Sequence, residues 1–132
     1  MTKKDLIELI KENENRIDTK VFVNDDKNKD KLGSNQFREL AEICASAECF
    51  EEIELLMGYN IAKDKDKNSW AKEKDGVSVG KVILGCMKEI EEKSKKDGDN
   101  VLKNLSLFFG YMYWKARIWA AERSQYNKRG NK

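Results

Sequence analysis

The sequence predicts an all-α fold: one domain over residues 1–132, in which about five helices form a bundle with two long charged loops. The length suits a single compact unit, because such units typically take ~100–200 residues. The chain contains no proline, which favours long uninterrupted helices. Five segments repeat apolar residues at steps of three and four, as one helix face does, and no pair of segments alternates as neighbouring strands would.

The first helix is expected over residues 2–17, with Thr2 as its N-cap and Asp5 as the partner residue of a capping box. A short β-prone patch follows at residues 21–23. The run of Asn, Asp and Lys from 24 to 31 contains no apolar residue, so it is predicted to be the first solvated loop.

Ser34 is expected to cap the second helix, whose apolar face includes Phe37 and Leu40. The third helix should begin near Phe50. It runs into the alternating charges of residues 63–68, which form the second predicted loop.

The fourth helix is expected over residues 78–96 and should stop at Gly98, because glycine readily takes the left-handed conformation that ends a helix. Asp99 is predicted to cap the last helix, residues 99–126. The side chains expected in the core are Phe37, Leu40, Ile53, Leu56, Ile83, Leu105, Phe108 and Met112.

The last helix carries a second apolar stripe opposite its core face. The members of this stripe follow one another at steps of four, three and four: Leu107, Tyr111, Trp114 and Ile118. A helix that is apolar on two sides is either the centre of its bundle or has one face turned to a partner. The sequence leaves both alternatives open, and the second predicts a protein interface.

Composition argues against most enzyme classes. The chain has no histidine, so it lacks the usual general base and the commonest zinc ligand. Cys44, Cys49 and Cys86 show no C-x-x-C spacing and are expected to pack as small apolar residues in a reducing interior. We therefore expect no enzymatic activity, no metal and no cofactor. A carboxylate-based hydrolase is the remaining enzymatic alternative.

Charge is nearly balanced over the whole chain but not along it. Residues 99–132 hold seven basic side chains against two acidic ones, although the net charge of the protein is only +2. Trp114, Trp119 and Tyr126 lie among these cations, which suits phosphate contacts and base stacking on single-stranded nucleic acid. The alternative is a basic tail, from about residue 123, that only adds solubility.

No apolar run approaches the ~20 residues that a membrane-spanning helix needs. The N-terminal segment is amphipathic and dense in Glu and Lys, unlike a targeting signal. A cytoplasmic protein with no membrane contact is expected.

Three stretches of the chain resemble motifs of one known family, in the same order. Residues 32–38, L-G-S-N-Q-F-R, resemble an L-T-x-x-Q-I-R helix opening, and residues 55–63, L-L-M-G-Y-N-I-A-K, are similar to an L-x-P-K-L-x-Y-x-A-x-R stretch. Residues 108–114, F-F-G-Y-M-Y-W, are similar to a C-terminal F-x-x-F-F-E-A-I-V-A-Y helix. The family is the small α-helical subunit of type III-A CRISPR–Cas effector complexes, the Csm complex small subunit.

This resemblance implies a non-catalytic, RNA-binding structural subunit of an antiviral ribonucleoprotein complex. It would line the groove in which guide and target RNA pair, beside other subunits and further copies of itself. Arg38 matches the arginine of the family's Q-x-R motif, and Lys63 the basic residue that follows its Tyr-x-x-Ala pattern. Together with Lys67, Lys115 and Arg117, they are the predicted phosphate contacts.

Each part of this hypothesis has a plainer alternative. Arg38 is placed to form an intrahelical ion pair with Glu42, worth only ~0.3–0.5 kcal/mol on an exposed face. Lys63 suits a solvated charged loop. For the whole protein, the alternative function is a helical protein–protein adaptor that binds no nucleic acid and uses the second stripe of the last helix as its interface.

Overall fold

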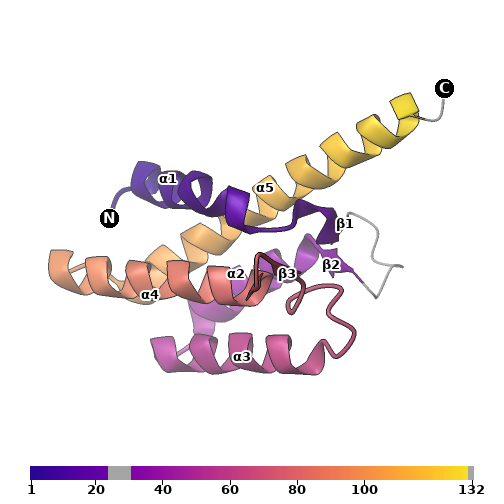
Figure 1. Ribbon diagram of the computed structural model, residues 1–132. Helices are drawn as coiled ribbons and strands as arrows, with labels where there is room; N and C mark the ends of the chain where they lie inside the picture. The colour runs from indigo at the N-terminus through magenta and orange to yellow at the C-terminus, as the bar shows by residue number, and fades with distance from the viewer. Residues whose placement is uncertain (24–30, 131–132) are drawn as a thin grey trace.

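The computed structural model describes residues 1–23 and 31–130, with side chains described as far as residue 122, and it confirms the all-α prediction. The first predicted loop therefore lies outside the described residues apart from Lys31, and so do the side chains of the basic tail. The described residues contain five α-helices (Figure 1): α1 (Lys3–Asn13), α2 (Asn35–Ser46), α3 (Phe50–Lys63), α4 (Val79–Asp97) and α5 (Val101–Gly130).

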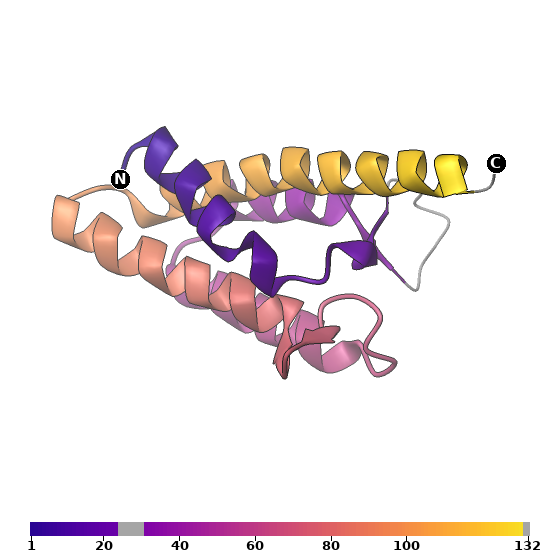
Figure 2. The same cartoon turned by 45° about the horizontal axis from the view of Figure 1, so that its top comes forward.

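α5 is the helix against which α1, α2 and α4 pack. α2 lies along it with the most extensive contact in the fold, α1 crosses it, and α4 reverses into it through a short turn (Figure 2). α3 packs mainly on α4 and touches α2 far less, so α2 and α3 diverge. The ribbon of α5 extends past the other helices at its C-terminal end (Figure 1).

Two minimal sheets join the helices. β1 (Phe22–Val23) pairs in parallel with β2 (Leu32–Gly33), and β3 (Glu73–Lys74) pairs antiparallel with β4 (Val77–Ser78). The β-prone patch thus becomes a strand, although strands of two residues are too short to show any alternation in the sequence. The Phe22 ring stacks on Trp119, with centroids 5.1 Å apart, so β1 closes the core over α5.

Helix ends follow the sequence closely at two positions. Thr2 Oγ1 accepts from the backbone N–H of Asp5, and the Asp5 carboxylate accepts from the N–H of Thr2, which completes the predicted capping box. Gly98 ends α4 with a φ of +73°, as predicted. The first helix is shorter than expected: α1 stops at Asn13, and the chain tightens into the 3-10 helix η1 (Glu14–Arg16), followed by η2 (Thr19–Val21).

The predicted cap of the last helix is wrong by one residue. Asn100 is the capping residue, since its Oδ1 accepts from the backbone N–H of Lys103 at 3.1 Å. Asp99 instead binds the ammonium group of Met1 together with Asp97, whose Oδ2 lies 2.9 Å from that nitrogen. These contacts fasten the first residue of the chain to the α4–α5 turn.

Seven of the eight predicted core residues are buried. Leu56 is the exception: it is half-buried, because it faces the space where α2 and α3 diverge. The prediction for the cysteines is right at Cys44 and Cys86, where burial raises the pKa of each thiol to about 12, and wrong at Cys49, which is exposed at the start of α3.

The second predicted loop is ordered by its own acidic residue. The Asp64 carboxylate accepts from the backbone N–H groups of Asn68, Ser69 and Ala71 at 3.3, 2.8 and 2.9 Å. Burial tends to raise the pKa of this carboxyl, but the N–H donors outweigh burial and hold the pKa below its usual value. The segment carries Trp70 into the core, where it is 2% exposed.

Among the described residues, no helix is both long enough and apolar enough to cross a bilayer. Within the same described residues, no three Cys, Asp or Glu side chains come close enough together to hold a metal ion.

Candidate interaction surface

The second stripe of α5 faces outward in its C-terminal half. Trp114 is 63% exposed and Ile118 is 48% exposed, whereas Leu107 and Tyr111 are half-buried against the edge of the core. The alternative in which α5 is the bundle centre is therefore wrong at Trp114 and Ile118. We call these four residues the Trp114 surface. An exposed tryptophan within an apolar group marks a contact surface more often than a lone apolar side chain does.

A groove runs along each side of this surface. The groove between α1 and α5 has a volume of about 170 Å³ and is floored by Ile7 and Ile10. The groove between α2 and α5 has a volume of about 310 Å³ and is lined in part by Ala41 and Leu107. Tyr111 and Trp114 line both grooves, and their ring centroids lie 5.7 Å apart. They form an aromatic ridge with an apolar groove on either side.

Two of the five predicted phosphate contacts, Arg38 and Arg117, lie beside this ridge, each near the Tyr113 ring. Arg38 lines the α2–α5 groove together with Tyr113 and Trp114, and the Arg117 guanidinium lies 5.8 Å from the centroid of the Tyr113 ring. We call these four residues the guanidinium–aromatic cluster. Both helices position it, because α2 supplies Arg38 and α5 supplies the other three.

Arg38 also makes the ion pair that the sequence suggests. Its Nε lies 3.9 Å from Glu42 Oε1, and the side chains are 66% and 72% exposed. An exposed pair of this length contributes little to stability, about 0–1 kcal/mol. The Arg38 guanidinium therefore keeps most of its hydration and its capacity to bind an anion.

The other three predicted contacts do not join this cluster. Lys115 lines the α1–α5 groove on the other side of the ridge, where its Nζ pairs with Glu14 at 3.2 Å and lies 5.6 Å from the centroid of the Trp119 ring. Lys63, at the end of α3, lies over the Tyr59 ring. Lys67 pairs with Glu73 at 3.9 Å. These five cations thus do not form one continuous surface.

The aromatic residues expected to stack on nucleic acid also differ in their exposure. Trp114 is accessible, but Trp119 is only 7% exposed and is held against Phe22, so the expectation for Trp119 is wrong. Tyr126 lies outside the described side chains. Tyr113 was not singled out in the sequence, although its position four residues before Arg117 places the two side chains on one helix face.

No protein-family model matches the chain, and no curated protein or solved structure is significantly similar to it. The resemblance to the CRISPR–Cas small subunit therefore depends on the three stretches of sequence. In the structure, residues 32–38 run from β2 into α2, residues 55–63 belong to α3, and residues 108–114 belong to α5.

Proposed function

We propose that this chain is a non-catalytic structural subunit of an RNA-containing assembly and that it contacts RNA through the guanidinium–aromatic cluster. The observation that carries the proposal is that Arg38 of α2 lines one groove with the Tyr113 and Trp114 rings of α5, while the Arg117 guanidinium lies 5.8 Å from the centroid of the Tyr113 ring. One guanidinium group can donate two parallel hydrogen bonds to two oxygens of a phosphate, and an aromatic ring can stack on any base. Together they suit an RNA strand that is held without its sequence being read.

Charge and resemblance support the same proposal. The last 34 residues carry seven basic side chains against two acidic ones, and a positively charged segment attracts RNA phosphates. The three stretches that resemble the small subunit of type III CRISPR–Cas complexes favour an antiviral ribonucleoprotein as the assembly. One subunit offers few contacts, so tight binding would depend on several copies along one strand.

An adaptor that binds only protein is the second candidate, and the Trp114 surface favours it. Trp, Tyr and Arg are the residue types that dominate binding energy at protein interfaces. Trp114 and Ile118 are exposed beside two apolar grooves. In this function the ridge inserts into a partner protein, and the arginines flank the contact.

A salt titration separates the two functions. Fluorescence anisotropy with labelled single-stranded RNA is measured at several salt concentrations for the wild type and for Arg38→Gln/Arg117→Gln. Because each neutralised phosphate contributes about −0.7 to the slope of log affinity against log salt, the double variant should reduce the slope by about 1.4. Lys81→Gln/Lys88→Gln, on the exposed face of α4, removes the same charge and should leave the slope nearly unchanged.

Trp114→Ala tests the stacking contact separately. Loss of one stacked base should weaken RNA binding roughly 5- to 100-fold, since such a contact is worth about 1–3 kcal/mol. Equal slopes for the two double variants would remove the cluster from the RNA site. An absence of RNA binding at low salt, by the free chain and by the assembly purified with it, would reject the RNA proposal in favour of the adaptor. Lys63→Gln/Lys67→Gln then tests whether RNA reaches the end of α3.

A further inference from the structure

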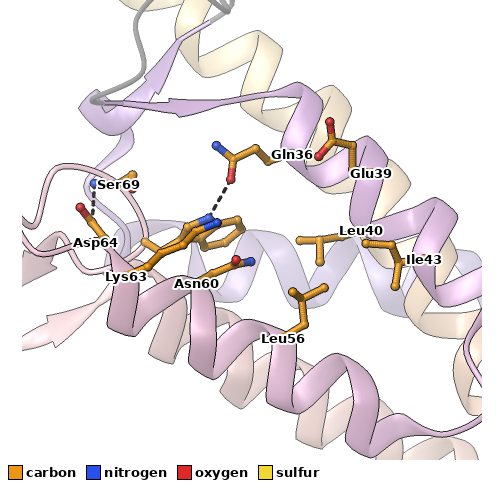
Figure 3. Close-up of a pocket in the computed structure, with 10 residues that line it drawn as sticks. Gln36, Glu39, Leu40, Ile43, Leu56, Asn60, Lys63, Asp64 and Ser69 are labelled. Atoms are coloured by element: carbon orange, nitrogen blue, oxygen red, sulfur yellow. Dashed lines mark hydrogen bonds between the residues drawn. The ribbon is translucent and has the colours of Figure 1, made fainter.

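A second cavity lies between α2 and α3, and none of its lining residues belongs to the guanidinium–aromatic cluster. Its volume is about 570 Å³. It exists because α2 and α3 diverge, which leaves Leu40 and Ile43 of α2 facing Leu56 of α3 across open space (Figure 3). These aliphatic side chains form walls that suit the faces of a flat apolar ring.

One end of the cavity is closed by a firmly held tryptophan. The Trp70 indole Nε1 donates to Gln36 Oε1 at 2.8 Å, and the Trp70 carbonyl accepts from the N–H of Gly80 at the same distance. A Cβ at Gly80 would lie 2.3 Å from Cγ1 of Ile61, so only glycine allows α4 to approach this closely. The end wall is therefore formed in advance of any ligand.

Asn60 is the buried polar residue of the cavity lining, whereas Gln36 and Ser69 are only half-buried. It is only 8% exposed, its side chain makes no hydrogen bond with any described residue, and its amide is directed toward the space between α2 and α3 (Figure 3). A carboxamide presents a hydrogen-bond acceptor beside a donor. Because no described side-chain N or O atom is both buried and unpaired, solvent reaches this amide in the empty protein, and a ligand with a complementary donor and acceptor can take the place of that solvent.

The charged side chains that line the cavity are Glu39, Lys63 and Asp64. Figure 3 shows Glu39 and Lys63 on different sides of it. The Asp64 carboxylate already accepts three backbone N–H groups, so it is occupied by its own loop. A ligand that is neutral at its ring and polar at its outer parts fits this distribution better than a compact ion does.

We propose that this cavity binds a nucleobase and that the Asn60 carboxamide pairs with the base edge. Adenine fits the donor–acceptor pattern, because its N6 amino group donates and its N7 accepts, and Asn pairs with both at once. The base belongs to a free nucleoside or nucleotide, or to an unpaired position of an RNA strand. The proposal does not require the guanidinium–aromatic cluster to bind RNA.

The test is a titration of the full chain with adenosine, followed by saturation-transfer NMR and calorimetry. Asn60→Leu, which removes the amide and retains similar bulk, should weaken adenosine binding at least tenfold. Leu55→Ala changes a residue of the same helix that is 77% exposed and lies outside the cavity lining, and it should bind as the wild type does. The ligand 7-deazaadenosine, which lacks the N7 acceptor, should bind the wild type at least tenfold more weakly than adenosine.

Leu56→Trp provides an independent variant in case Asn60→Leu fails to fold, since it fills the cavity and leaves the amide in place. It should also abolish adenosine binding. The proposal is overturned if adenosine does not bind, if it binds both cavity variants as it binds the wild type, or if 7-deazaadenosine binds as well as adenosine.

A hexamer of adenylate, added as competitor, distinguishes the two sources of the base. Stronger competition by the hexamer than by adenosine monophosphate identifies an RNA strand as the source, and equal competition identifies a free nucleotide. Arg38→Gln/Arg117→Gln should lose affinity for RNA and keep its affinity for adenosine. That result separates a failure of the cluster from a failure of the cavity.

Discussion

Phe108 and Trp114 are large aromatic residues on the same helix, yet Phe108 is 1% exposed and Trp114 is 63% exposed. Phe108 packs against Phe109 in the core, with ring centroids 5.4 Å apart. Trp114 lies between two grooves. The difference shows that an apolar residue stabilises this fold only where another element covers it. The same kind of side chain on the uncovered face of α5 is available for binding.

The largest effect on stability is expected on the covered face. Phe108→Ala removes most of a fully buried ring and should lower the free energy of unfolding by about 3–5 kcal/mol. Urea denaturation followed by circular dichroism measures this loss. A decrease below about 1 kcal/mol would show that this face of α5 is not the core.

A smaller effect is expected where the covered face contains a polar contact. Asn104 Nδ2 donates to Ser94 Oγ at 2.9 Å, and both residues are buried between α4 and α5. Asn104→Ala leaves the Ser94 hydroxyl without this partner and should cost about 1–3 kcal/mol. A double-mutant cycle with Ser94→Ala should show coupling, and strictly additive losses would contradict the contact.

The border between the two faces should contribute less again. The Lys115–Glu14 pair is half-buried, so Lys115→Met should lower the free energy of unfolding by about 0.5 kcal/mol at low salt and by less at high salt. Lys88→Met is the matched control, since Lys88 is 63% exposed and lies 3.8 Å from Glu54. Equal losses of unfolding free energy in the two variants would mean that the Lys115–Glu14 pair does not stabilise the packing of α5.

The smallest effect on stability is expected at the ridge itself. Trp114→Ala should change the free energy of unfolding by less than about 0.5 kcal/mol, because the ring has little contact to lose. The more drastic Trp114→Glu should also fold. Thermal denaturation of both variants checks this, and unfolding of either one would place Trp114 in the core and end its role as a contact residue.

The sequence predicted the features that depend on neighbours along the chain. The capping box at Thr2 and the glycine that ends α4 both involve residues within one turn, so their patterns are visible in the printed letters. The apolar stripes of α5 were visible for the same reason. Which stripe is covered depends on where α1 and α2 pack, and a one-dimensional pattern does not contain that information.

Long-range contacts account for what the sequence did not show. Trp70 finds its partner Gln36 34 positions earlier along the chain. Leu56 satisfied the spacing of a core residue, but the divergence of α2 and α3 leaves it at a cavity. Within the candidate site, Arg38 and Arg117 were expected from residue type. Their positions near the same Tyr113 ring depend on the packing of α2 against α5.

The contrast between Trp114 and the other two tryptophans has a spectroscopic consequence. Trp70 and Trp119 are buried, so their indoles should emit at shorter wavelengths and resist aqueous quenchers, whereas Trp114 should emit at longer wavelengths and be quenched readily. Acrylamide at low concentration should therefore quench the fluorescence of Trp114 and leave that of the other two tryptophans. A partner protein docked on the ridge should shift the emission to the blue and protect it from acrylamide, without a label and without a change to the chain.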